Sequence, residues 1–159
     1  MRFFYACQNP DSGAIAFNMA KVLVVDDDAD SRELLAKYLR NSGHRVALAP
    51  NGSDALAALT VDTPDVVVLD YKMPQMDGVS FLEVIRCYLR WQSLPVILLT
   101  AYPDGPHIRR GVELGIRKTF LKSDFDLADL ATHVATCSSP AIAGGPDGPS
   151  ESPYSPFQH

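Results

Sequence analysis

Short apolar runs alternate with amphipathic stretches along the middle of the chain. The apolar runs predict five β-strands, over residues 21–25, 45–49, 65–69, 95–99 and 119–121. Three of these runs are aliphatic throughout instead of alternating with polar residues. Continuous apolar strands are typical of a parallel sheet that is covered on both faces.

The stretches between the runs predict five helices, because apolar side chains recur there at the spacing of one helix face. The predicted helices span residues 29–41, 53–60, 79–90, 106–114 and 124–136. Gly43 follows the first helix and is a signal for a helix end. Asp28 and Asp77 precede the first and third helices, and we expect each to act as an N-cap.

Five successive strand–helix units predict an α/β fold. Right-handed crossovers place helices on both faces of a doubly wound, five-stranded parallel sheet, and the flavodoxin-like strand order 2-1-3-4-5 suits it. We expect this domain to span residues 19–137. Residues 1–18 are predicted to be disordered or an extra leader, and the Pro-, Gly- and Ser-rich residues 138–159 a disordered tail.

Composition excludes several classes of protein. The 159-residue chain carries a net charge of −5, which argues against direct DNA binding because phosphate neutralisation needs a dense cationic face. Its apolar runs fall well short of the roughly 20 residues that a membrane helix needs, and the N-terminus lacks a signal-peptide pattern. The three cysteines show no metal or disulfide spacing. We therefore expect a cytoplasmic protein.

Reactive side chains follow the carboxyl ends of the predicted strands. Asp26 and Asp27 follow the first strand, Asp70 the third and Thr100 the fourth, and the fifth runs into Lys122. These strand ends form sites in open α/β sheets, where three adjacent carboxylates would repel each other. Mg²⁺ would offset that repulsion and also binds phosphoryl oxygens. An aspartate can act as a nucleophile in phosphoryl transfer. A metal ion, the lysine ammonium and the threonine hydroxyl could then neutralise the charge on the phosphoryl group. These residues together therefore suit phosphoryl transfer to an aspartate.

Taken together, four segments of the sequence resemble the response-regulator receiver family of two-component signalling. They are VLVVDDD, VVVLDYKMPQMDG, VILLTA and FLK, which end four predicted strands in order. Thirty residues separate Asp70 from Thr100, and twenty-two separate Thr100 from Lys122. Both separations are usual for receivers. The resemblance covers about residues 21–136.

The resemblance implies a role for each residue of the site. Asp70 would be the phosphoacceptor, Thr100 would turn its hydroxyl towards the phosphoryl group, and Lys122 would pair with that group. The resemblance also implies a site for Mg²⁺ or Mn²⁺, to which Asp27 would bind directly and Asp26 largely through water. Its full ligand set would be Asp26, Asp27, Asp70 and the backbone carbonyl of Lys72.

As a receiver, the protein would accept its phosphoryl group in a phosphorelay, from a histidine kinase or a phosphotransfer protein. No output domain fits in residues 138–159, so we expect signalling by contact with a downstream protein target. The contact face would be the fourth helix, fifth strand and fifth helix, and the family also allows a homodimer that forms on phosphorylation. We do not expect an enzyme: the protein's only chemistry would be self-catalysed phosphoryl acceptance and slow autodephosphorylation.

Two positions depart from the family pattern. Thr119 stands where receivers usually carry an aromatic residue that follows the threonine, and Phe120 should point to the other face of the sheet. Ser123 stands where a proline, often in a cis peptide, usually follows the lysine. A non-proline cis bond costs about 2.5–4 kcal/mol, so we expect the Lys122–Ser123 bond to be trans.

The fourth predicted helix should be marginal. It follows the turn-rich residues 102–106 and contains Gly111, which costs about 1 kcal/mol relative to Ala. The basic residues in this region are either a solvated face or a docking patch for an acidic partner; they are Arg109, Arg110, Arg117 and Lys118. The histidines show no metal spacing and are expected to be structural or surface residues; they are His44, His107, His133 and His159.

Two other functions remain open. A degenerate receiver that acts as a constitutive scaffold would fit the departures at Thr119 and Ser123. A Mg²⁺-dependent phosphatase of the haloacid dehalogenase type would also use Asp, Thr and Lys. That family places its nucleophile in a DxD segment after the first strand, where Ala29 follows Asp28, and it would leave Asp70 without a role.

Overall fold

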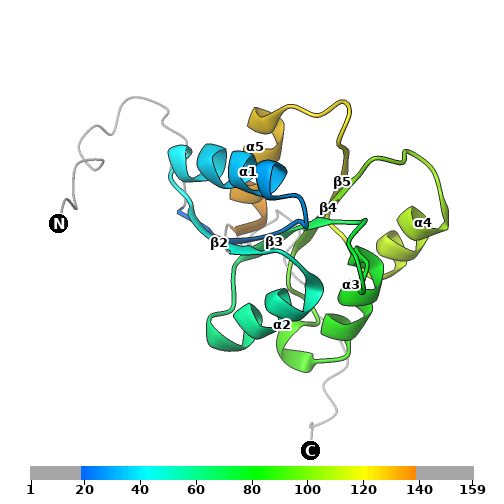
Figure 1. The fold of residues 1–159 in the computed structure, drawn as a ribbon. Helices are drawn as coiled ribbons and strands as arrows, with labels where there is room; N and C mark the ends of the chain where they lie inside the picture. Colours follow the sequence, from blue (N-terminus) through cyan, green and yellow to red (C-terminus); the bar gives the residue numbers. More distant parts are fainter. Residues whose placement is uncertain (1–18, 139–159) are drawn as a thin grey trace, which may run out of the picture.

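A five-stranded parallel sheet runs through the middle of the protein (Figure 1). The computed structural model describes residues 19–138. The strands are β1 (Lys21–Val25), β2 (Arg45–Ala49), β3 (Val66–Asp70), β4 (Val96–Thr100) and β5 (Lys118–Leu121). They lie in the order β2-β1-β3-β4-β5, which confirms the predicted flavodoxin-like topology.

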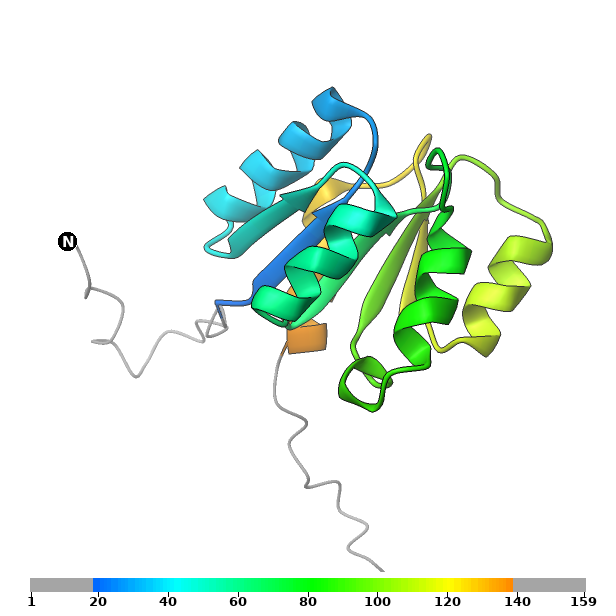
Figure 2. The ribbon, with the colours of Figure 1, turned by 60° about the horizontal axis from the view of Figure 1, so that its bottom comes forward.

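Helices cover both faces of this sheet (Figures 1 and 2). The elements are α1 (Ala29–Asn41), α2 (Gly52–Val61), α3 (Gly78–Arg86), the short 3₁₀ helix η1 (Leu89–Trp91), α4 (Pro106–Glu113) and α5 (Leu127–Ser138). α1 and α5 pack on one face and contact each other, whereas α2 and α3 pack on the other. α4 lies beside α3 at the β5 side of the molecule.

Two apolar layers sandwich the strands because successive strand side chains point to opposite faces. Leu23 and Val25 of β1 pack with Phe81 of α3, while Val22 and Val24 pack with α1 and α5. β3 and β4 are buried along their whole lengths, as expected for the inner strands of a parallel sheet. These strands are therefore continuously aliphatic because both of their faces are covered, as predicted.

The two inner strands β3 and β4 each begin one residue later than predicted. β3 begins at Val66, although Asp65 already contacts β1: its amide donates to the Lys21 carbonyl and its carboxylate accepts from the Lys21 amide, each at 2.8 Å. β4 begins at Val96 because Pro95 lacks an N–H, although its carbonyl accepts from the Val67 amide at 2.9 Å. Both strands also end one residue later than predicted, so Asp70 and Thr100 are the last residues of their strands.

The third helix ends at Arg86 instead of residue 90. The amides of Cys87 and Tyr88 bond three residues back, and the chain then forms η1. This turn buries Trp91, whose indole N–H donates to Thr63 Oγ1 at 3.3 Å. Burial of one large aromatic side chain is thus favoured over a last helical turn.

Helix ends follow the predicted caps. The Asp28 side chain accepts from the amide of Asp30 at 2.9 Å, and that of Asp77 accepts from Ser80 at 2.7 Å. Gly43 adopts a φ of 93° just beyond α1, a conformation that favours glycine. α5 begins at Leu127, not at residue 124, because the Asp126 side chain accepts from the Ala128 amide.

The predictions of a leader and a disordered tail concern residues 1–18 and 138–159. Except for Ser138, which is the last residue of α5, these residues lie outside the described part of the chain, as does His159. Within residues 19–138, each helix is too short or too polar to cross a bilayer.

Candidate functional site

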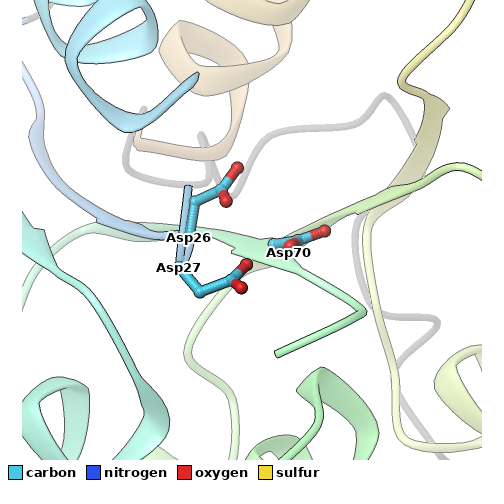
Figure 3. Close-up of side chains that lie close together, drawn as sticks. All are labelled: Asp26, Asp27 and Asp70. Carbon is cyan, nitrogen blue, oxygen red and sulfur yellow. The ribbon is translucent and has the colours of Figure 1, made fainter. Parts of the chain in front are cut away.

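Three aspartates meet at the carboxyl edge of the two central strands (Figure 3). Val25 pairs with Leu69 in the parallel register of β1 and β3, so Asp26 and Asp27 emerge beside Asp70. One oxygen from each carboxylate lies within 4.8 Å of the others. Asp26 and Asp70 are buried and Asp27 is exposed, so the acidic pocket opens to solvent on one side.

One ammonium group faces this acidic pocket. Lys122 follows β5, and its Nζ lies 3.0 Å from Asp26 Oδ2 and 3.0 Å from Asp70 Oδ1. The Lys122 amide donates to the Thr100 carbonyl at 2.8 Å, which continues the pairing of β4 with β5 and fixes the start of the side chain. A single positive charge cannot balance three carboxylates, so the pocket keeps a negative potential that attracts cations.

The pKa of Asp70 is raised to about 6, mainly by burial and also by the neighbouring charges of Asp26 and Asp27, while the hydrogen bond and charge of Lys122 oppose this rise. Burial lowers the pKa of Lys122, but its hydrogen bonds to Asp70 and Asp26 outweigh that effect and leave the pKa raised. At neutral pH the pocket therefore holds an ionised Asp70 beside a charged lysine, which is the state a nucleophilic carboxylate requires.

The Asp26 carboxylate is already bound by protein donors on both oxygens. Oδ1 accepts from the Asp28 amide at 2.9 Å, and Oδ2 accepts from Ser31 Oγ and from Lys122 Nζ, each at 3.0 Å. The Arg32 guanidinium donates to the Asp26 carbonyl at 2.7 Å. Ser31 was not predicted from the sequence, although its place in the first turn of α1 faces the strand end.

The loop after β3 folds back on the strand through a close backbone approach. The Gly78 amide donates to the Tyr71 carbonyl at 2.8 Å, and a Cβ at position 78 would lie 2.6 Å from the Asp70 carbonyl oxygen. Glycine is therefore required where the helix α3 begins. Lys72 lies exposed in this loop, two residues after Asp70.

Thr100 ends β4 and is fully buried. Its hydroxyl accepts from the Tyr102 amide at 3.1 Å, and it lies 3.3 Å from both the Tyr102 carbonyl and His107 Nε2. The hydroxyl is thus engaged by the loop that follows its own strand and by α4. Register places Leu99 opposite Asp70, so Thr100 lies one residue beyond the pairing partner of Asp70.

His107, which was expected to be a structural or surface residue, is half-buried and packs against the site. Besides contacting the Thr100 hydroxyl, its ring stacks on Tyr71 with centroids 4.0 Å apart. The sequence signal was its position near the start of the helix after β4, on the same edge as the strand ends. His44 is structural as predicted, because it is buried and its Nδ1 accepts from the Ala20 amide at 3.2 Å.

The structure shows the local conformation at Ser123 and Thr119, the two positions that depart from the family pattern. Every peptide bond in the described part of the chain is trans, including Lys122–Ser123, as we expected. Phe120 packs against Phe125 and His133 in the layer of α1 and α5. The neighbouring Thr119 therefore occupies the opposite face of β5, the one on the side of α2 and α3.

Some of the basic residues around α4 already contact acidic or aromatic side chains. Arg110 contacts Glu83 at 2.8 Å and Glu113 at 3.0 Å, and Lys118 Nζ lies 5.8 Å from the ring centre of Phe120. These pairs are exposed and contribute little to stability. The Arg110 contacts favour the solvated charged face over a docking patch.

Comparisons with known proteins agree with this geometry. Residues 22–135 match the response regulator receiver domain. The transcriptional regulatory protein PrrA of Mycobacterium tuberculosis is 38% identical over 136 residues, which cover 79% of this chain and 57% of PrrA. The chain thus spans a little over half the length of that relative.

Solved structures show the same fold. The chemotaxis response regulator CheY4 of Vibrio cholerae is 28% identical, with a TM-score of 0.69 over 76% of this chain and 99% of CheY4. The Mn²⁺-bound form of response regulator Rcp1 is 24% identical, with a TM-score of 0.62 over 74% of this chain and 90% of Rcp1. The family match over residues 22–135 shows that the chain belongs to the response regulator receiver domain family.

Proposed function

We propose that the protein accepts a phosphoryl group on Asp70 from a histidine kinase or a phosphotransfer protein. Receiver domains partner with histidine kinases and do not turn over a separate substrate. The observation that carries the proposal is the pocket of Asp26, Asp27 and Asp70 with one ammonium bridging two of its carboxylates. A buried nucleophilic carboxylate beside a cation is the arrangement that phosphoryl transfer to an aspartate needs.

The same pocket suits a divalent cation, Mg²⁺ or Mn²⁺. The donors are hard oxygens, which such ions prefer. Because protein donors already bind both oxygens of Asp26, we assign direct ligation to Asp27 and Asp70 and an outer, water-mediated place to Asp26. The backbone carbonyl of Lys72 is a further ligand in this proposal. When bound, the ion would neutralise the oxygens of the transferred phosphoryl group.

Asp70 would form a new bond from a carboxylate oxygen to phosphorus while the bond from phosphorus to the donor nitrogen breaks. Lys122 contacts Oδ1 of Asp70, which makes Oδ2 the proposed attacking oxygen. Once Asp70 is an acyl phosphate, the negative charge lies on the phosphoryl oxygens, and Lys122 is near enough to contact them. Thr100 would supply the hydroxyl donor, for which it must exchange one of its present contacts.

Output would pass through protein contacts of α4, β5 and α5. α4 has a single buried residue, Gly111, whereas α3 has four. An element held by few buried contacts is the one that a charge change at the strand ends can shift. Its partner would be a downstream protein, and a homodimer formed on phosphorylation is a second form that this face allows.

A constitutive scaffold is the second candidate, and Thr119 is the observation that favours it. The intact acidic pocket and its lysine argue against it, because adjacent buried acids are costly in a protein that does not use them. The dehalogenase-type phosphatase finds no support: Asp28, the second acid of that motif, caps α1.

NMR with beryllofluoride, a phosphoryl mimic, tests the proposal. Addition of beryllofluoride and Mg²⁺ to the ¹⁵N-labelled wild type should shift the amides around Asp26–Asp28 and Asp70–Lys72. Asp70→Asn, which keeps the size of the side chain but removes the nucleophile, should show no such change. An unresponsive wild type, or an equal response of the variant, would contradict the proposal and leave the scaffold as the better account.

A further inference from the structure

The Thr100 hydroxyl has one proton and two acceptor positions, and its neighbours compete for them. The Tyr102 amide donates to the oxygen at 3.1 Å, while the Tyr102 carbonyl and His107 Nε2 both lie at 3.3 Å. If the hydroxyl donates to a phosphoryl oxygen, it can no longer donate to His107. In the other tautomer His107 donates to the oxygen, and movement of the hydroxyl breaks that bond as well.

His107 also contacts the residue that follows the strand carrying the phosphoacceptor. Its ring stacks on Tyr71, the residue after Asp70, with an interplanar angle of 16°. Tyr102 meets the ring edge-on with centroids 6.3 Å apart. One side chain of α4 is thus in contact with the ends of both β3 and β4.

The position of the imidazole depends on a glycine. A Cβ at position 105 would lie 2.7 Å from His107 Nδ1 and 2.8 Å from Cε1. Gly105 therefore leaves the space that the ring occupies, and an added Cβ there would meet the ring first.

The first turn of α4 has few other attachments. Its N-cap, Gly105, offers no side-chain hydrogen bond, and Pro106 follows at the first position. Gly111, in the last turn, is the buried residue of the helix. The contacts of His107 with Thr100 and Tyr71 therefore anchor the N-terminal end of α4 to the strand ends.

We propose that His107 is a positioning residue that couples the phosphorylation state of Asp70 to α4 through the Thr100 hydroxyl. This inference rests on the proposed function. When Thr100 turns to the phosphoryl group, His107 Nε2 loses its partner and the first turn of α4 changes position. Thr119, which stands where receivers usually carry an aromatic residue, leaves this task to a residue of α4 itself.

The wild type gives a direct readout. In ¹⁵N spectra of the histidine rings, beryllofluoride with Mg²⁺ should shift the Nε2 signal of His107 and the amides of residues 108–113. The ring signals of His44 and His133 should stay in place. If the amides around Asp26–Asp28 and Asp70–Lys72 respond but His107 Nε2 does not, the coupling is wrong and the proposed function stands. If neither responds, the proposed function itself fails.

Two variants separate coupling from packing. His107→Phe keeps an aromatic ring on Tyr71 but lacks the nitrogen, and Gly105→Ala keeps the histidine but displaces it. In both, the pocket amides should still respond, while the response of residues 108–113 should fall about fivefold, the effect of one hydrogen bond on a two-state equilibrium. His133→Phe makes the same change on α5 and should respond like the wild type. An undiminished α4 response in both variants would overturn the coupling.

Discussion

At the scale of single residues, the acidic pocket contains charges that lower the stability of the folded protein but suit a function. Asp26 and Asp70 are buried with 0% and 3% exposure, respectively. The neighbouring Lys122 compensates only part of their charge. Removing a buried, poorly compensated charge commonly stabilises a protein, because the free-energy cost of desolvating that charge is removed.

We therefore expect Asp70→Asn to stabilise the metal-free protein above pH 6. The folded-state pKa of Asp70 is raised to about 6 from its usual value of 3.8. A raised pKa means that the acid contributes stability below its unfolded pKa and that this contribution is lost as pH rises through about 6. The gain at pH 8 should be about 1–3 kcal/mol, measured by urea unfolding in EDTA.

The same experiment at pH 5 should show a smaller gain, because part of Asp70 is already protonated there. Asp104→Asn, at an exposed position in the loop before α4, serves as the control and should change the free energy of unfolding little at either pH. A wild type as stable as Asp70→Asn at pH 8 would show that the pocket is not strained by its charges.

Metal affinity should depend on pH through the same carboxylate. The ion binds the ionised form, so protons compete with it below the metal-free pKa of about 6. We expect the affinity for Mg²⁺ or Mn²⁺ to fall by up to about tenfold per pH unit below pH 6. Calorimetric titrations at pH 5, 6 and 7 measure this, and a flat profile would exclude Asp70 as a ligand.

At the scale of elements, the strand ends were the most predictable feature of the chain. The order of aliphatic runs determines the sheet, and the parallel register then brings Asp26, Asp70 and Lys122 together. The predicted end of α3 was wrong because the burial of Trp91 and its hydrogen bond to Thr63 depend on residues distant in sequence. The contact of His107 with Thr100 was missed for a similar reason, since it depends on the path of the loop between them.

The start of α3 requires glycine for lack of space. Gly78→Ala should destabilise the protein by about 2–4 kcal/mol, because the added Cβ would lie 2.6 Å from the Asp70 carbonyl oxygen. Gly52→Ala is the matched control: its Cβ would meet the flexible Met76 side chain, which can move. Equal effects of the two substitutions in chemical unfolding would contradict this account.

α4 should exchange its amide hydrogens faster than α3. Its residues 108–113 are held by one buried glycine and exposed ion pairs, whereas α3 buries Phe81, Leu82 and Ile85. Local opening then costs less free energy in α4. Hydrogen exchange followed by NMR measures this directly, and equal protection of the two helices would contradict the expectation that α4 is marginal.

At the scale of the whole molecule, a rigid sheet positions the pocket and a lightly held helix lies beside it. The sheet is buried between two apolar layers, so the strand ends keep their places when the charge at Asp70 changes. α4 is in contact with those ends through His107. A change of charge at the fixed pocket can therefore change the position of α4 and the surface that it presents. A signalling domain needs such a response.

Phosphorylation of Asp70 is the central claim, and intact-mass spectrometry after incubation with acetyl phosphate and Mg²⁺ tests it most directly. We predict that the wild type gains the mass of one phosphoryl group, that EDTA prevents the gain, and that Asp70→Asn does not show it. A wild type that stays unmodified, or a variant that is modified equally, would contradict the account.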